Sequence, residues 1–250
     1  MTPALAALIA AVAALGGWAA GWLTAGAALT AAAIGTCVLS GGGTGSLVLL
    51  GTFFVSGSLL SARGRGGSGR GPAQVLANSW AAAVGGLVIP YAPEAGSAIL
   101  AGGLAAAQAD TWATEVGRHS RRSPRLISTG RPVTAGTSGG VTVLGTLGGG
   151  AGAVIIALLA RAAGLPAPAL GIAVAGVAGM LADSVLGATV QARYVCEACG
   201  ETVETLRHCE SATGYVRGVR WMTNDTVNAF GTGIGAVAAA LGMLGWSAAA

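Results

Sequence analysis

The sequence contains no lysine, and only 9% of its 250 residues are charged. Soluble domains carry about 25% charged residues, so this chain lacks the polar side chains needed to cover its surface in water. Aromatic residues are also scarce, at 5%. The formal net charge is +4, but the shortage of aromatic rings for stacking on bases argues against a nucleic-acid-binding protein. These absences exclude an ordinary soluble domain and favour a protein embedded in lipid.

Hydrophobic residues make up 53% of the chain, and the mean hydropathy is +0.71. The 44 glycines follow no triplet repeat and lie within Ala-, Leu- and Val-rich runs, which excludes a collagen-like chain. Small residues in apolar helices allow the close backbone approach through which membrane helices pack. The composition therefore predicts a tightly packed helical bundle.

Apolar runs between turns and charges predict an all-α, polytopic membrane bundle of about eight spans in a single domain, residues 1–250. The first run lacks a preceding basic segment, so we expect a retained span rather than a cleaved signal peptide. The second run is short and rich in Gly and Thr, which makes it the weakest of the series. The predicted spans lie near residues 3–23, 25–41, 44–62, 73–92, 95–117, 137–161, 167–192 and 223–247.

Twelve of the 13 arginines lie in three hydrophilic loops, at residues 62–72, 118–135 and 193–222. With eight spans, all three loops fall on the same side of the bilayer. The positive-inside rule makes that side cytoplasmic and places both termini outside. We therefore expect a prokaryotic plasma-membrane protein whose working face, including the loop at 193–222, is in the cytoplasm.

Four carboxylates lie within or at the ends of the predicted spans, where an ionisable group is costly and needs a partner. They are Asp110, Glu115, Asp183 and Asp225. Amides accompany them, and carboxylates with amides suit Mg²⁺, which prefers oxygen ligands; a proton relay is the alternative. Asp110 and Glu115 are five residues apart, roughly 140° around a regular helix. They serve one site only if the helix unwinds there or if they face different partners.

The segment 128–140 is composed mainly of glycines, hydroxyl residues and one arginine. Glycines allow close backbone approach, hydroxyls donate hydrogen bonds, and arginine binds phosphate through two parallel bonds. The run 136–140 opens the sixth predicted span, so a helix N-terminus is expected to point at an anion. A Walker motif is excluded because it requires lysine. The predicted phosphate-binding residues are Ser128, Thr129, Arg131, Gly136, Thr137, Ser138, Gly139 and Gly140.

The third loop contains Cys196-x₂-Cys199 followed by His208-Cys209. Two interpretations stay open. The four side chains offer a tetrahedral ligand set for a structural Zn²⁺, although adjacent residues seldom bind one ion comfortably. Alternatively, the CxxC pair is redox-active. A disulfide is disfavoured by a reducing cytoplasm, and Cys37 is expected to be a small core residue.

Five blocks in this sequence resemble one family of membrane proteins, in the same order along the chain. They are QVLAN (74–78), DTWATEVG (110–117), GTSGGVT (136–142), ADSVLGATVQ (182–191) and RWMTNDTVN (220–228). The family contains transmembrane protein 19 and the phytyl-phosphate kinase of the vitamin E pathway. The spacing of the Cys/His residues is also similar, whereas residues 1–65 match only as apolar spans.

This resemblance implies a membrane kinase that converts an isoprenyl monophosphate, such as phytyl or geranylgeranyl phosphate, to the diphosphate, with CTP as donor. The four acids would hold Mg²⁺ or order its waters, and the segment 128–140 would bind phosphates. The amides expected to assist are Asn78, Asn224 and Asn228. Two alternatives remain: a proton-coupled transporter, for which an internal inverted repeat is missing, and a non-catalytic protein that binds lipid phosphates.

Overall fold

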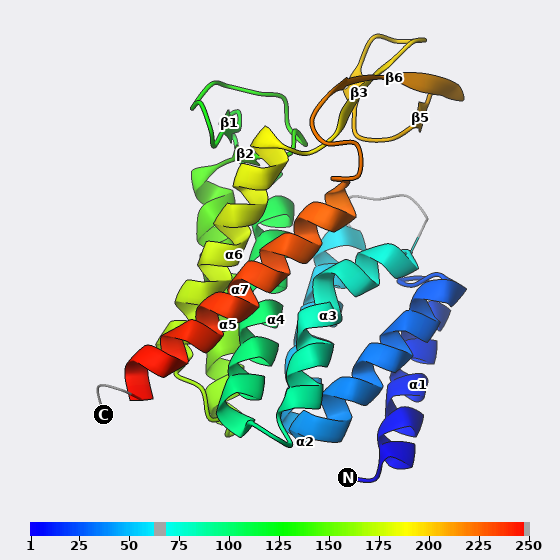
Figure 1. Cartoon of the computed structure of the whole chain (residues 1–250). Helices are drawn as coiled ribbons and strands as arrows, with labels where there is room; N and C mark the ends of the chain where they lie inside the picture. The colour runs from blue at the N-terminus through cyan, green and yellow to red at the C-terminus, as the bar shows by residue number, and fades with distance from the viewer. Residues whose placement is uncertain (63–68, 248–250) are drawn as a thin grey trace.

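The computed structural model describes residues 1–62 and 69–247, and within them the chain forms seven helices and two small β-sheets (Figure 1). The longest helix, α2, is interrupted at Gly43, where φ is 65° and ψ is −164°. Its two halves correspond to the two predicted spans 25–41 and 44–62. The helices are α1 (Pro3–Ala19), α2 (Ala25–Ala62), α3 (Pro72–Val88), α4 (Pro93–Gly117), α5 (Val143–Ala162), α6 (Ala169–Thr189) and α7 (Asn224–Ser247).

The strands correct the all-α expectation. A two-stranded antiparallel sheet joins β1 (Arg125–Leu126) to β2 (Gly140–Val141). The segment predicted as a hydrophilic loop at 193–222 contains a four-stranded sheet in the order β4-β3-β6-β5, because its β-branched and aromatic residues are interrupted by tight turns. Its strands are β3 (Arg193–Cys196), β4 (Thr202–Val203), β5 (Arg207–His208) and β6 (Ser211–Arg217).

Among the described residues, four helices are long and apolar enough to cross a membrane: α2, α5, α6 and α7. Helix α1 is apolar but has only 17 residues, and α3 has the same length. Helix α4 is longer, but its second half carries Asp110 and Glu115. The chain is therefore an integral membrane protein with four candidate spans, and the count of about eight stays a prediction.

Helix α4 lies at the centre of the bundle and packs against α2, α3, α5, α6 and α7 (Figure 1). Every residue from Ala101 to Ala109 is buried. A helix surrounded in this way must carry apolar or small residues on all sides. Gln108 is the long polar residue of this buried stretch, and its side chain is hydrogen-bonded to Ser56 of α2. The bundle is thus organised around one helix rather than around a single apolar stripe.

Small residues bring the helix backbones into contact, as the glycine content predicted. A Cβ atom added to Gly102 of α4 would lie 2.6 Å from the carbonyl oxygen of Gly235 in α7. A Cβ atom on Gly86 of α3 would lie 2.5 Å from the carbonyl oxygen of Cys37 in α2. No L side chain fits at such separations without backbone movement, so these glycines set the distances between helices.

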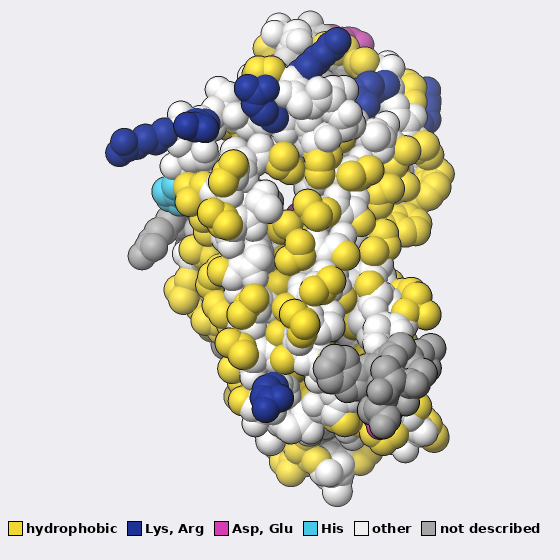
Figure 2. Space-filling model, turned by 90° about the vertical axis from the view of Figure 1, so that its left-hand side faces the viewer, with side chains coloured by type: hydrophobic (Ala, Val, Ile, Leu, Met, Phe, Trp, Pro, Cys, Tyr) yellow, Lys and Arg dark blue, Asp and Glu magenta, His cyan; other side chains and the backbone are white. Residues whose placement is uncertain are grey.

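The two ends of the molecule differ. The β-sheets and the loops that carry them lie at one end, and the start of α1 and the last turn of α7 lie at the other (Figure 1). Most dark-blue basic side chains in Figure 2 gather at the sheet end, above a flank of hydrophobic side chains. Arg161, in the last turn of α5, is at the opposite end, while Arg63 and Arg65 lie outside the described residues. The side of the membrane that the sheets face stays a prediction.

Replacing Gly86 by alanine should destabilise the bundle, because the new methyl group would meet backbone atoms of α2. Overpacking of this kind costs about 1–3 kcal/mol. Gly150→Ala in α5 is the matched control, since nothing lies within 4 Å of its added Cβ and alanine is the better helix former. Thermal melts in detergent should show a lower transition for Gly86→Ala only; equal melting temperatures would contradict the packing argument.

Candidate active site

A cavity of about 400 Å³ opens beneath the loop at 135–142 and extends between the helices. Its walls come from α1 to α7, from that loop and from Glu204. Eleven of the predicted site residues line it: Asn78, Asp110, Glu115, Gly136, Thr137, Ser138, Gly139, Gly140, Asp183, Asn224 and Asn228. Residues from blocks far apart in the sequence therefore share one cavity, although their roles stay predictions.

Four of these side chains also line a much smaller pocket deeper in the bundle, of about 10 Å³. They are Asn78 from α3, Asp110 from α4, Asp183 from α6 and Asn228 from α7. Oxygen Oδ2 of Asp183 is buried and has no hydrogen-bond partner among the described residues. The carboxyl groups of Asp110 and Asp183 thus share this small space. Two carboxyl groups flanked by two amides form an arrangement that a cation or a proton would stabilise.

Small residues about one turn from the polar side chains explain how three of these helices converge here. A Cβ atom on Gly179 of α6 would lie 2.6 Å from the carbonyl oxygen of Gly231 in α7 and 2.5 Å from Cβ of Ala106 in α4. A Cβ atom on Gly231 would lie 3.1 Å from Cβ of Asp183. Close packing of α4, α6 and α7 therefore places the polar side chains next to one another.

Glu115 has a different environment from Asp110. Ser61 donates a hydrogen bond to its Oε1 at 2.8 Å, and Nη1 of Arg118 donates to its Oε2 at 2.9 Å. Helix α4 is regular through both positions, so the two acids face different partners, the second of the alternatives raised by their spacing. Both oxygens of Glu115 are already bonded, which suits a residue that fixes the cavity wall better than a free metal ligand.

The glycine run 136–140 does not form the start of a helix, which corrects the predicted sixth span at 137–161. Helix α5 begins at Val143, and Oγ1 of Thr142 accepts a hydrogen bond from the backbone N–H of Gly145 at 2.9 Å. Gly136 and Gly139 have φ values of 89° and 78°, a conformation that side chains disfavour. The run therefore lies as an irregular loop over the cavity, with Gly139 against Ala188 at the end of α6.

Four predicted site residues do not line the cavity. Ser128, Thr129 and Arg131 are exposed at the tip of the loop, where Nη1 of Arg125 donates to the carbonyl oxygen of Gly130 and so closes the turn. Asp225 is half-buried in the first turn of α7 and also lies outside the cavity lining. The segment 128–140 is thus divided: its second half meets the cavity and its first half is directed away.

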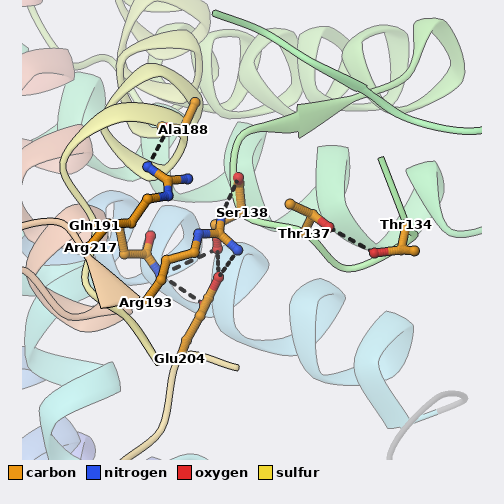
Figure 3. A network of polar contacts seen from close by, with 8 residues as sticks. All are labelled: Thr134, Thr137, Ser138, Ala188, Gln191, Arg193, Glu204 and Arg217. Atoms are coloured by element: carbon orange, nitrogen blue, oxygen red, sulfur yellow. Dashed lines mark hydrogen bonds and ion pairs between the residues drawn. The ribbon is translucent and has the colours of Figure 1, made fainter. Parts of the chain in front are cut away.

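Sequence reasoning missed the residues that hold the loop in place (Figure 3). Ser138 donates to Oε1 of Glu204 at 2.5 Å, and Nε2 of Gln191 donates to Oε2 of Glu204 at 2.7 Å. Arg193 donates to the carbonyl oxygen of Ser138 at 2.9 Å, and burial lowers the pKa of this guanidinium although the charge of Glu204 opposes that shift. No local pattern distinguishes Glu204 from the other acids of its segment.

Arg70, one of the arginines of the predicted loop 62–72, also lines the cavity. Its guanidinium lies 5.8 Å and 5.4 Å from the ring centroids of Phe53 and Phe54. Arg118, the partner of Glu115, lines the cavity as well. Two arginines therefore add positive charge to the cavity wall, Arg118 beside Glu115 and Arg70 beside the two phenylalanine rings.

Beyond these charged groups the cavity is lined by apolar side chains of α1 and α2, which we call the apolar arm. Its members are Ala10, Ala13, Ala14, Ala31, Ile34, Leu47, Leu50, Phe53 and Phe54. Gly51 also lines the arm, and a Cβ atom added there would meet nothing within 4 Å. One cavity thus combines a charged end with an apolar end.

The Cys/His residues come together in the four-stranded sheet, away from the cavity. One ligand atom from each of Cys196, Cys199, His208 and Cys209 lies within 4.8 Å of the others. The backbone N–H of Cys199 and the side chain of His208 lower the pKa of Cys196 to about 6, while interactions with Cys199 and burial raise that of Cys209 to about 11. The structure groups the predicted ligands, and their function stays a prediction.

Comparison with known proteins gives several similarities. The sequence family described as "Integral membrane protein DUF92" matches residues 8–236. An uncharacterized membrane protein of Synechocystis is 32% identical over 79% of this chain and 73% of its own length. Protein PGR of Arabidopsis thaliana is 36% identical over 41% of this chain, and an uncharacterized membrane protein of Methanocaldococcus jannaschii is 39% identical over 37%. These matches cover 40% and 39% of the latter two proteins, and no solved structure matches the chain.

The two kinds of acid should respond oppositely to neutralisation. In the presence of a metal chelator, Asp183→Asn should raise the free energy of unfolding by about 1 kcal/mol, because it removes a buried carboxyl oxygen that has no hydrogen bond within the described residues. Glu115→Gln should cost about 1–3 kcal/mol, because it weakens charge-assisted hydrogen bonds. Thermal denaturation of both variants beside the parent protein measures this contrast. A large loss of stability in Asp183→Asn would mean that this carboxylate is a structural group instead.

Proposed function

The chain belongs to the integral membrane protein family DUF92, and we propose that it is a membrane kinase acting on a lipid phosphate. This membership confirms the family resemblance carried by the five sequence blocks. The proposed reaction transfers the γ-phosphoryl group of a nucleoside triphosphate, CTP, to an isoprenyl monophosphate such as phytyl or geranylgeranyl phosphate. One observation carries the proposal: the same cavity is lined by Asp110, by Asp183, whose Oδ2 has no hydrogen bond within the described residues, and by the apolar arm.

The donor set at the charged end fits Mg²⁺. Asp110 and Asp183 supply carboxylate oxygens, Asn78 and Asn228 supply amide oxygens, and the buried Oδ2 of Asp183 is without a hydrogen bond in the described chain. Mg²⁺ prefers a few carboxylates, retained waters and substrate phosphates over a complete protein cage. Bound there, the ion would neutralise charge on the transferred phosphoryl group. Glu115 is assigned to the wall, since its oxygens bind Ser61 and Arg118.

The wall above the acids suits phosphate groups. The loop at 136–140 exposes glycine backbone to the cavity, and Arg70 and Arg118 line it as well. Glycine permits close approach of backbone to a ligand, and arginine binds phosphate oxygens through two hydrogen bonds. The nucleotide and the acceptor phosphate would be positioned here, with the acids beneath them.

The apolar arm suits the isoprenyl tail of the acceptor. An isoprenyl phosphate carries its charge at one end of a long hydrocarbon, and the cavity has the same polarity from the acids to α1 and α2. Helix α2, which supplies much of the arm, is one of the candidate spans, and this supports a place for the arm within the membrane. A tail in the arm would bury apolar surface while its phosphate stays near Asp110 and Asp183.

In the proposed reaction, an oxygen of the acceptor monophosphate attacks the γ-phosphorus of the nucleotide. The bond between that phosphorus and the β–γ bridging oxygen breaks, and the nucleoside diphosphate leaves with the electron pair. The acceptor is already anionic at pH 7, so no side chain has to remove a proton. Catalysis then depends on positioning and charge neutralisation, which are the contributions expected of phosphoryl-transfer enzymes.

A direct assay tests the proposal. Purified protein in lipid nanodiscs, given γ-labelled CTP, Mg²⁺ and geranylgeranyl phosphate, should yield labelled diphosphate. Asp110→Asn and Asp183→Asn should each lower kcat by at least ~10²-fold, because loss of one charge-stabilising group costs about 2.7–4 kcal/mol in comparable sites. Glu94→Gln, an exposed acid in the first turn of α4, is the matched control and should keep full activity.

The same preparation separates the alternatives. Stabilisation by geranylgeranyl phosphate without labelled product would replace the kinase with a lipid-phosphate binding protein. Proton-dependent uptake into proteoliposomes, again without labelled product, would identify a transporter that uses the acids as a relay. Full activity in both Asp→Asn variants would refute the assignment of the acids.

The apolar arm makes a second prediction, on acceptor length. Gly51→Leu should place a side chain in the open part of the arm and exclude the far end of a long tail. Each displaced CH₂ group forfeits about 0.8 kcal/mol, so KM for a C20 acceptor should rise at least ~10-fold and that for a C10 acceptor much less. Gly150→Leu, which adds a side chain in open space outside the cavity lining, is the control. Unchanged KM ratios between the two acceptors would place the tail elsewhere.

A further inference from the structure

The Cys/His cluster has the dimensions of a tetrahedral metal site. Nδ1 of His208 lies 3.5 Å from Sγ of Cys199 and 3.3 Å from Sγ of Cys209. With Zn–S near 2.3 Å and Zn–N near 2.1 Å, the ligand atoms around one ion are separated by roughly 3.5–3.8 Å. The cluster, whose ligand atoms all lie within 4.8 Å, is therefore only slightly wider than an occupied site.

The backbone at the end of β5 explains how adjacent residues can share one ion. Successive side chains of a strand point to opposite faces, so His208 and Cys209 would diverge in an extended chain. Here Cys209 and Glu210 form the two-residue turn between β5 and β6, with φ values of 50° and 59°. Non-glycine residues in this conformation cost about 1–3 kcal/mol each and are retained where something compensates. The turn brings Sγ of Cys209 beside Nδ1 of His208.

The second nitrogen of His208 also has the environment of a metal-bound imidazole. Nε2 lies 4.0 Å from Oε2 of Glu201. Imidazole ligands usually donate their other N–H to a carboxylate or carbonyl, which fixes the ring and its tautomer. Nδ1 is therefore the ring nitrogen beside the cysteines, and Nε2 lies near Glu201 but beyond hydrogen-bonding distance.

The sheet that contains the cluster also contacts the loop over the cavity. Glu204 lies between β4 and β5, in the same small sheet as the four ligands, and it accepts the hydrogen bond from Ser138. Arg193, the first residue of β3, donates to the carbonyl oxygen of Ser138 and lies 3.5 Å from Oε1 of Glu204. The β4–β5 segment has few residues and two-residue strands, so its position depends on what fixes the sheet.

We propose that Cys196, Cys199, His208 and Cys209 bind one structural Zn²⁺ ion, and that this ion holds Glu204 and Arg193 against the loop at 136–140. The three cysteines and one histidine match a closed Cys₃His site, in which no coordination position is left for a substrate. The role of the ion is to fix the sheet, and through Ser138 the sheet fixes the loop. This inference does not depend on the kinase assignment, because it concerns the folding of the loop and not the reaction.

Metal content tests the site. Full-length protein purified in detergent without added chelator should contain about one Zn²⁺ per chain by mass spectrometry of the element. Replacing the zinc with Co²⁺ should give the thiolate charge-transfer absorption and the strong visible bands of a tetrahedral site. Cys199→Ser and Cys209→Ser should each lower zinc retention by about tenfold or more, whereas Cys37→Ser, in a helix far along the chain from the cluster, should keep it.

Three results would overturn the site. The parent protein could be isolated without zinc and fail to take up Zn²⁺ or Co²⁺ after reduction, or all three Ser variants could retain zinc equally. The third result is a disulfide between Cys196 and Cys199 in the freshly isolated protein. The last would assign the CxxC pair to redox chemistry. Because the Co²⁺ spectrum is recorded on the parent protein, the test does not require that any variant fold.

Hydrogen exchange tests the link from the ion to the loop. Removing zinc with a chelator should speed amide exchange in residues 136–140 by about tenfold or more, while α4 stays protected. Glu204→Gln should loosen the same residues but keep its zinc, since Glu204 is not a ligand. Unchanged exchange in the zinc-free protein would refute the link even if the metal binds.

Discussion

The close packing of helices around α4 is the constraint on which the rest of the structure depends. Lipid removes most of the hydrophobic drive between membrane helices, so they associate through van der Waals contact and must approach closely. Glycines such as Gly102, Gly179 and Gly235 provide that approach, because even one added Cβ atom would overlap a neighbouring helix. The same short separations bring Asn78, Asp110, Asp183 and Asn228 together from four helices. The close packing that holds the helices together therefore also forms the candidate site.

The cavity contains two kinds of buried carboxylate, and the difference between them separates a residue of the wall from a candidate ligand-binding residue. Glu115 is held by Ser61 and Arg118 and belongs to the wall. Asp183 is buried beside Asp110, and its Oδ2 has no hydrogen bond within the part of the chain that the structure describes. A bundle would be more stable without this second arrangement. Such local costs are typical of positions kept for binding a ligand, and here they occur where a charged end meets an apolar arm.

The small sheet at the end of the bundle connects two features that are separate in the sequence. Its Cys/His cluster lies beyond the helices, whereas Glu204 and Arg193 reach the loop over the cavity (Figure 3). An irregular glycine-rich loop has little to fix its conformation by itself. The network at Ser138 supplies that restraint from outside the membrane helices. In the proposed kinase, the sheet would thus position the loop that meets the phosphates, without contacting the lipid tail.

Composition and hydropathy by themselves determined that the chain is a membrane protein, approximately where its helices lie, and that the acids, amides and the 136–140 run are the residues to examine. These are local properties, because apolar runs and residue types can be identified in the sequence without knowing which residues are in contact in space. Tertiary structure alone decided that Asp110 and Asp183 meet while Glu115 is bonded elsewhere, because helical periodicity gives the face of a residue and not its partner. It also decided that α5 begins at Val143, that Ser128 and Arg131 point away, and that Glu204 rather than another acid reaches Ser138. These positions depend on strand register and on contacts between helices, and a local sequence pattern specifies neither.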